Sequence, residues 1–323
     1  MSAASRPRSR RYLSFGLRLV LTIMLLGMVL RNMDLGSVKE GLQGNLGPAL
    51  ALSFGLLLLA LALSSLRWIL VSRIISVNLE LANAVPIVLI GHFFNQLLPT
   101  SFGGDAMRGW CLWRQGATLQ QAFASVLFDR LVGLVALILL VVAGLPLLGL
   151  RLGTPLPLVL SISIVIAGAI GLILLFNLHR VPNSVRRLRV WSLLERLSDY
   201  TRKLLNAPAI SLTGLALSLA VHASALYTTA IISDALGAPL PMIDALLIVP
   251  TVLVLTALPL SIGGWGIREA GLAGGFTLLG LDPSVAVTTS VLFGAINIAG
   301  GILGGLVFVA MGRPGPIRSE DAS

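Results

Sequence analysis

The sequence has few charged residues. Asp, Glu, Lys and Arg make up only 11% of its 323 residues, whereas 56% are hydrophobic. Soluble domains carry roughly 25% charged residues. This composition therefore excludes a chain that presents mainly water-soluble surface, and with it a soluble catalytic domain.

Residues that bind metals or form disulfides are also scarce. The single cysteine, Cys111, excludes an intrachain disulfide and a multi-cysteine metal site. The three histidines are widely spaced, and there is no Asp-Asp-x-x-Asp run that would hold magnesium. A membrane enzyme acting on polyprenyl phosphates or phospholipids needs such clusters at membrane level. We therefore expect no cofactor, no metal and no enzymatic activity.

The sequence is rich in apolar runs, of which several approach or exceed the roughly 20 residues that cross a bilayer. They are continuous and do not alternate as barrel strands do, so they predict helices. The fold class expected is all-α, a polytopic membrane protein with about six to eight transmembrane helices. The long runs are Phe15–Leu30, Pro48–Val71, Gln121–Leu150, Pro155–Asn177, Pro208–Leu236 and Pro283–Met311, and the shorter ones are Ala82–Leu98 and Pro241–Leu258.

The net charge of +10 is concentrated in two stretches, residues 1–18 and 179–203. Beside membrane spans, such basic segments indicate the cytoplasmic side and contact with anionic lipids, and not nucleic-acid binding. No small-residue cleavage site follows the first run, so we expect it to stay as a helix. The predicted organisation is a cytoplasmic tail (1–13), one transmembrane domain (14–311) with a cytoplasmic loop (178–207), and a second cytoplasmic tail (312–323). The predicted location of the protein is the cell membrane.

A parity argument concerns the first half of the chain. If the N-terminus and loop 178–207 are both cytoplasmic, the number of crossings between them is even, yet five apolar runs precede the loop. Ala82–Leu98 is short and runs into Pro99, which favours a re-entrant segment that returns through residues 101–115. The alternative is that Gln121–Leu150, which contains Pro146, is not one simple span.

An internal repeat is the most informative pattern in the chain. Residues 98–108 and 258–268 align without gaps, and both read L-P-x-S-x-G-G-x-x-x-R after a short apolar run. Proline ends a helix, and paired glycines permit unusual dihedral angles and close approach to the backbone. Short, broken segments at matching places in two halves are typical of a transporter's central site. If both segments are re-entrant they form an inverted repeat, although Pro241–Leu258 could equally be a full span.

The repeat predicts an anion site. The amide groups that start the second half-helix attract an anion, and Arg108 and Arg268 follow one turn later as a clamp for phosphate. The alternative is that both motifs are turns whose arginines reach lipid headgroups. The candidate binding residues are Asn95, Pro99, Ser101, Gly103, Gly104, Asp105, Arg108, Asp129, Arg130, Pro259, Ser261, Gly263, Gly264, Arg268 and Glu269.

Several polar side chains in apolar surroundings have a structural interpretation. Asp129 and Arg130 are adjacent and so point about 100° apart on a helix, which predicts that each pairs with another group. Asn95 is expected to bond the carbonyls of the broken helix, and Asn297 to bond across helices. The tryptophans near segment ends, Trp68 among them, are expected at the membrane interface.

Three motifs in order, residues 95–108, AFASVLFDR at 122–130 and LPLSIGGWGIRE at 258–269, resemble the transmembrane region of the lysylphosphatidylglycerol synthase family, also called flippase-like proteins. The resemblance implies a multi-spanning fold with re-entrant elements that moves lipid-linked cargo between leaflets. Members are associated with aminoacylated phosphatidylglycerol, polyprenyl-linked sugars and hopanoid lipids. Full synthases add a soluble aminoacyl-transfer domain; here only residues 312–323 follow the last span, so aminoacyl transfer is not expected.

Translocation of a lipid or lipid-linked headgroup is thus the leading hypothesis, with membrane lipids as the cargo. The main alternative is a lipid-binding subunit that transports nothing and assists a glycosyltransferase or synthase in the cell envelope. A membrane-embedded lipid-modifying enzyme ranks third.

Overall fold

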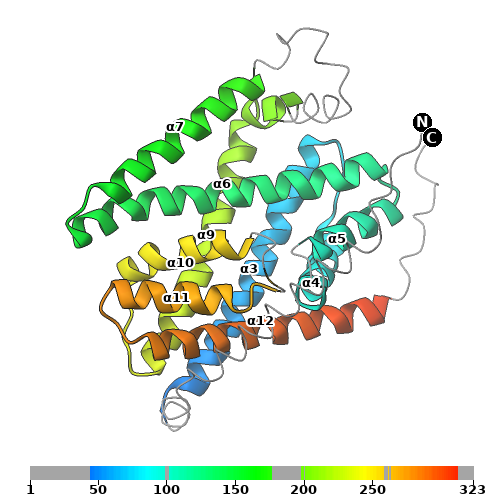
Figure 1. The fold of residues 1–323 in the computed structure, drawn as a ribbon. Helices are drawn as coiled ribbons and strands as arrows, with labels where there is room; N and C mark the ends of the chain where they lie inside the picture. The colour runs from blue at the N-terminus through cyan, green and yellow to red at the C-terminus, as the bar shows by residue number, and fades with distance from the viewer. Residues whose placement is uncertain are drawn as a thin grey trace, which may run out of the picture.

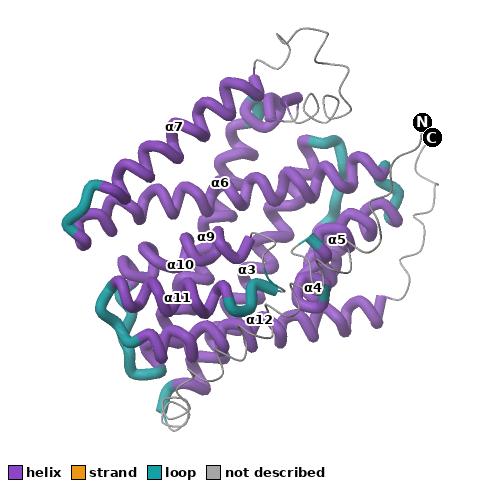
Figure 2. Tube along the Cα trace, in the orientation of Figure 1, coloured by secondary structure: helices purple, strands orange, loops and turns teal. Residues whose placement is uncertain are grey.

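The computed structural model describes residues 44–98, 102–176, 198–199, 201–257, 261 and 263–311, and these residues form helices and connecting turns without any strand (Figure 2). The first apolar run, both terminal tails and most of loop 178–207 lie outside the described residues, as do Pro99, Ser101 and Pro259. The domain boundaries at 14 and 311 therefore stay predictions. The all-helical, polytopic fold class is confirmed.

The described helices fall into two similar sets. The first contains α3 (Leu46–Ile74), α4 (Leu81–Leu97), α5 (Gly103–Arg114) and α6 (Leu119–Leu152), and the second contains α9 (Pro208–Ala235), α10 (Met242–Ala257), α11 (Ile267–Leu278) and α12 (Pro283–Met311). Between them lies α7 (Leu156–Phe176). Each set reads long helix, short helix, break, shorter helix, long helix.

Four helices of the described chain, α3, α6, α9 and α12, are long and apolar enough to cross a membrane. Each coincides with one of the predicted long runs. The run Gln121–Leu150 forms one continuous helix in spite of Pro146, which removes the alternative that it is broken. Thr118 and Gln121 form a capping box at the start of α6, and Gly153, in the left-handed conformation, ends it.

The two sets pack as a symmetric pair. The main contacts are preserved when α3, α4, α5 and α6 exchange roles with α9, α10, α11 and α12: α4 packs on α12 as α10 packs on α6, and α3 packs directly on α9. Figure 1 shows α3 and α9 running in opposite directions, as do α6 and α12. The relation between the two sets is therefore that of an inverted repeat.

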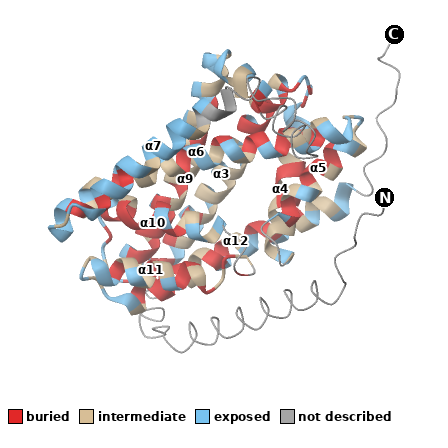
Figure 3. Cartoon of the chain, turned by 45° about the horizontal axis from the view of Figure 1, so that its top comes forward, coloured by how far each residue is buried: buried red, intermediate tan, exposed pale blue. Residues whose placement is uncertain are grey.

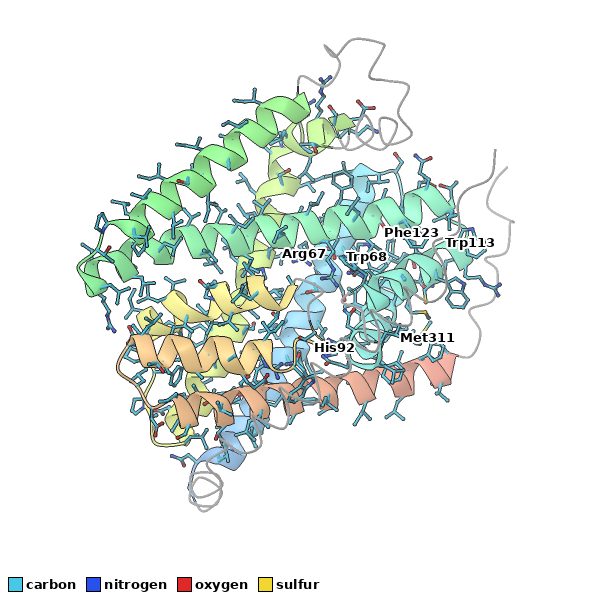
Figure 4. The ribbon with its side chains drawn as sticks, in the orientation of Figure 1. Arg67, Trp68, His92, Trp113, Phe123 and Met311 are labelled. Carbon is cyan, nitrogen blue, oxygen red and sulfur yellow. The ribbon has the colours of Figure 1, made fainter. Side chains whose placement is uncertain are left out.

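Each short pair of helices forms a helical hairpin. We call α4 and α5 hairpin 1, and α10 and α11 hairpin 2; in each, the two helices pack on each other. The open end of hairpin 1 is held by a hydrogen bond from Gln115 Nε2 to Asn83 Oδ1 (3.3 Å). Hairpin 2 begins beside the end of α6, where Arg151 Nη2 lies 2.8 Å from Asp244 Oδ1. Trp113 and Met311, at the ends of α5 and α12, lie at one end of the molecule (Figure 4).

Small residues let each hairpin approach a long helix of the other set. A Cβ added at Gly304 of α12 would overlap the carbonyl oxygen of Leu89 in α4. A Cβ added at Gly144 of α6 would lie 2.9 Å from the carbonyl oxygen of Leu246 in α10. The two glycines are separated by the same interval as the two sequence motifs, so the repeat extends into the helix packing.

The buried residues gather around the hairpins and the helices that contact them, whereas α7 is largely exposed (Figure 3). Its main contact is with α6 alone. Exposed leucine, isoleucine and valine side chains cover its outer face, including Leu156, Val165 and Ile173. Such a face suits contact with lipid tails.

Candidate functional site

In hairpin 1, α4 ends at Leu97 and α5 begins at Gly103, and the proline of the repeat lies between them in the sequence. The amide of Gly104 donates to Asn95 Oδ1 (2.9 Å). The sequence pattern predicted that Asn95 bonds carbonyl groups of the broken helix, whereas this bond satisfies an amide group of α5. A Cβ added at Gly104 would overlap the carbonyl oxygen of Gly91. The paired-glycine motif is needed here because α5 starts in direct contact with the backbone of α4.

In hairpin 2 the break uses left-handed backbone. Gly263, Gly264 and Gly266 have φ values of 60°, 77° and 83°, which only glycine adopts without strain. The amide of Gly266 donates to Glu269 Oε2 at the start of α11. Ser261 is 3% exposed, and its hydroxyl has no hydrogen-bond partner among the described residues.

The tips of the two hairpins meet. An ideal Cβ built on Gly263 of hairpin 2 would lie 3.8 Å from Oε1 of Gln96 in hairpin 1. In Figure 1 the ends of α10 and α11 that flank the break point towards α4 and α5. The two repeated motifs are thus brought together from opposite halves of the chain.

Next to hairpin 1, two arginines share one buried carboxylate. Asp129 of α6 is 1% exposed, and its oxygens accept from Arg67 Nε (2.7 Å) and from Arg108 Nη2 (2.8 Å). Arg67 comes from α3 and also donates to Ser218 of α9 (3.0 Å). Both arginines are 8% exposed. Two guanidinium groups against one carboxylate leave this buried triad with an excess positive charge.

A second ion pair adjoins the triad. Arg130 Nε donates to Asp105 Oδ2, and Asp105 Oδ1 lies 3.8 Å from Arg108 Nη1. As predicted, the neighbours Asp129 and Arg130 therefore pair with other groups. Of the two hairpin arginines, Arg108 contacts Asp129, and Arg268 contacts Glu269.

In hairpin 2 the arginine and its acid balance each other. Arg268 Nη2 lies 2.8 Å from Glu269 Oε1, and the hydroxyl of Ser290 in α12 accepts from Arg268 Nε (2.9 Å) while donating to the same Glu269 oxygen (2.8 Å). Glu269 is 0% exposed and Arg268 is 8% exposed. Both hairpin arginines are therefore held in buried networks, and neither is a surface residue that reaches headgroups.

The two hairpin arginines have matching surroundings. The Arg108 guanidinium stacks 4.3 Å from the ring centroid of Trp68, and that of Arg268 lies 4.9 Å from the ring centroid of Trp265. Each also lies against a glycine, Gly91 for Arg108 and Gly294 for Arg268, where a Cβ would collide with the arginine side chain.

Trp68 was wrongly predicted at the membrane interface. It is fully buried and donates from Nε1 to Ser125 Oγ (3.2 Å). Figure 4 shows it beside Arg67 on α3. Near the end of an apolar run a tryptophan can lie at the interface or pack inside the protein. Here Trp68 packs inside, against the Arg108 guanidinium.

The other polar side chains are structural. His92 and His222 contact the carbonyl oxygens of Asn297 (3.0 Å) and Gly133 (2.9 Å), so each of these interior histidines has a hydrogen-bond partner. The Asn297 amide donates to the Phe293 carbonyl oxygen of its own helix (2.9 Å), and not, among the described residues, to another helix as the sequence pattern predicted. Within the described chain no group of three metal-ligating side chains occurs.

Arg67 was not a sequence candidate, yet it completes the triad. It is the single charged residue within the run Pro48–Val71, and a lone charge inside an apolar run is a recognised sign of an interior site. That signal was available in the sequence. The partners of Arg67 on α6 and α9 were not, because they depend on the packing of three helices.

The comparisons with known proteins agree with this architecture. The family described as lysylphosphatidylglycerol synthase TM region matches residues 15–305. A protein of Methanothermobacter thermautotrophicus named "UPF0104 membrane protein" is 24% identical over 305 residues, which cover 85% of this chain and 88% of the relative. No solved structure matches the chain significantly.

Proposed function

Because the chain belongs to the lysylphosphatidylglycerol synthase transmembrane-region family, we propose that it translocates a lipid or lipid-linked group with an anionic headgroup across the cytoplasmic membrane. The observation that carries the proposal is the pair of hairpins, whose tips approach each other and whose open ends lie at opposite ends of α6 and α12 (Figure 1).

The hairpin arrangement supports a path from both leaflets. A helical hairpin that enters from one face and returns to it brings broken backbone to the middle of a membrane protein, where such backbone is tolerated only beside protein or a wet cavity. Two of them, related as an inverted repeat, offer the same broken motif to each face in turn. In this proposal both hairpins are re-entrant, and hairpin 1 opens to the cytoplasm.

The charged groups support an anionic cargo. Arg67 and Arg108 together contact one carboxylate, and Arg108 Nε is a buried donor without a hydrogen-bond partner in the described part of the chain. A phosphate group near the tips of the hairpins would supply the missing acceptor. The lipid tails would stay in the bilayer while the headgroup passes between the tips.

The exposed apolar side chains of α7 support a position of the lipid tails in the bilayer, outside the protein core. The positive-inside argument orients both tails and loop 178–207 towards the cytoplasm. In this proposal the protein acts as a transporter and not as an enzyme. A glycosyltransferase or synthase that makes or uses the cargo is the natural partner.

The test is a translocation assay in vesicles. The purified protein is reconstituted, and the rate at which a labelled anionic lipid becomes accessible in the opposite leaflet is measured for wild type, Arg108→Gln and Arg151→Gln. Arg151 also pairs with an aspartate, but at the far end of α6, so it is the matched control.

Wild type and Arg151→Gln should translocate the lipid, and Arg108→Gln should be slow. Binding of the lipid without any translocation by wild type would contradict the proposal and favour the lipid-binding subunit. Equal rates in all three proteins would show that the arginine of hairpin 1 has no part in transport.

A further inference from the structure

We propose that the charge balance beside hairpin 1 selects a headgroup with one net negative charge, which is the charge of a phosphodiester. This inference rests on the proposed function, because it concerns the cargo of the same site. It is carried by the count of charges in the buried triad and in the ion pair beside it, and by their contacts.

The excess charge beside hairpin 1 is one. In the triad, Arg67 and Arg108 contribute two positive charges, and Asp129, which contacts both, contributes one negative charge. The adjoining pair of Asp105 and Arg130 is balanced. Over these five groups, all described in the structure, the sum is therefore +1.

The triad that carries the excess charge is buried, since Arg67 and Arg108 are 8% exposed and Asp129 is 1% exposed, whereas Arg130 of the balanced pair has a 40% exposed side chain. A charge in a low-dielectric interior is stabilised when an opposite charge pairs with it. A phosphodiester brings one negative charge and neutralises the cluster. A phosphomonoester carries about −1.5 to −2 and would leave the cluster with an excess negative charge, whereas a zwitterionic headgroup would leave the positive charge in place.

The contacts leave one donor of Arg108 unpaired among the described residues. Arg108 uses Nη2 for Asp129, and its Nη1 is 3.8 Å from Asp105, beyond hydrogen-bond distance. Its Nε, in a side chain that is 8% exposed, has no hydrogen-bond partner among the described residues. The available donor thus belongs to the arginine that the sequence motif places at the start of hairpin 1's second helix.

Hairpin 2 provides the contrast. Arg268, Glu269 and Ser290 form a closed network in which one positive and one negative charge contact each other at 2.8 Å. This network needs no further charge. The selection for headgroup charge is therefore assigned to hairpin 1, and hairpin 2 shapes the other wall of the site.

The ion pair of Asp105 and Arg130 allows the balance to be changed in both directions. Asp105→Asn raises the sum to +2, and Arg130→Gln lowers it to 0. Arg151→Gln, which disrupts a pair with Asp244 away from the cluster, is the control. Arg130→Lys keeps the charge and is the control for loss of the arginine side chain itself.

The experiment is a competition between two lipids. Purified wild type and each variant are incubated in detergent micelles that contain phosphatidylcholine and equal amounts of phosphatidylglycerol, a phosphodiester, and phosphatidic acid, a phosphomonoester. The retained lipids are then counted by native mass spectrometry. A nearby charge changes a protonation equilibrium by one to three pKa units, so Asp105→Asn should change the ratio of the two lipids by about tenfold or more.

Wild type and Arg151→Gln should retain phosphatidylglycerol in preference to phosphatidic acid. Asp105→Asn should shift the ratio towards phosphatidic acid, Arg130→Gln should weaken retention of both anionic lipids, and Arg130→Lys should resemble wild type. An unchanged ratio in Asp105→Asn, with anionic lipid still bound, would overturn the inference alone. Retention of only phosphatidylcholine by wild type would instead overturn the proposed function.

Discussion

The substitution Asp129→Asn tests the buried triad most severely. The change keeps the shape of the side chain but removes the one negative charge that Arg67 and Arg108 share at 2.7 and 2.8 Å. Both guanidinium groups then remain buried without a counter-charge. Removing one partner of a buried ion pair costs about 3–5 kcal/mol, and here two cations lose the same partner, so we expect destabilisation at the upper end of that range.

Removing one of the two positive charges, instead of the negative one, gives an internal comparison. Arg67→Gln leaves Asp129 paired with Arg108, and the remaining charges are balanced. It should therefore destabilise the protein clearly less than Asp129→Asn does, even though it removes a larger side chain and a hydrogen bond to Ser218. The order of the two effects follows from the balance of buried charge and not from the size of the side chain that is removed.

The assay uses a reporter that the chain already contains. Cys111 is its only cysteine and is 1% exposed, so a thiol-reactive dye should label it when the helices around it unfold. Free energies of unfolding in detergent, measured by dye labelling against denaturant, give the two costs directly. If Asp129→Asn costs no more than Arg67→Gln, the triad does not hold an excess positive charge and the reasoning fails.

Three further predictions concern the hairpins. Gly104→Ala should prevent α5 from packing on α4 and lower the yield of folded protein. Gly55→Ala, which has open space at its Cβ position, should be neutral or stabilise α3 by about 0.5–1 kcal/mol. Expression yield and dye labelling compare the two variants. Glu269→Gln should destabilise hairpin 2 by about 3–5 kcal/mol, as the loss of a buried pair does, and a cost below about 1 kcal/mol in the same assay would contradict this. In a protein without Cys111, Gln120→Cys should react with an impermeant reagent from the cytoplasm and Ile243→Cys from outside; labelling from the same side would refute the inverted hairpins.

Much of the fold could be predicted because it depends on local pattern. Continuous apolar runs predicted α3, α6, α9 and α12 to within a few residues. The gapless repeat predicted where α4 and α10 break, since proline and paired glycines act through the backbone alone. The same pattern predicted that the two breaks belong to one site, and their tips do meet.

The details of the site could not be predicted because they depend on contacts between distant helices. Asp129 had several candidate partners in the sequence, and only the crossing of α3, α5 and α6 selects Arg67 and Arg108. Arg67 and Trp68 were misjudged or missed because their position near the end of an apolar run suits a membrane interface as well as an interior. Asn95 was assigned the wrong partner, since the close approach of Gly104 to α4 cannot be read from spacing.

The central claim is that the tips of the hairpins hold the anionic headgroup of a membrane lipid. It is tested most directly by gentle solubilisation from the native membrane, followed by native mass spectrometry and identification of the lipids that co-purify with wild type, Arg108→Gln and Arg151→Gln. We predict that one anionic lipid class stays bound to wild type and Arg151→Gln and is lost from Arg108→Gln. The same bulk membrane lipids in all three proteins would contradict the claim and leave the two motifs as structural turns.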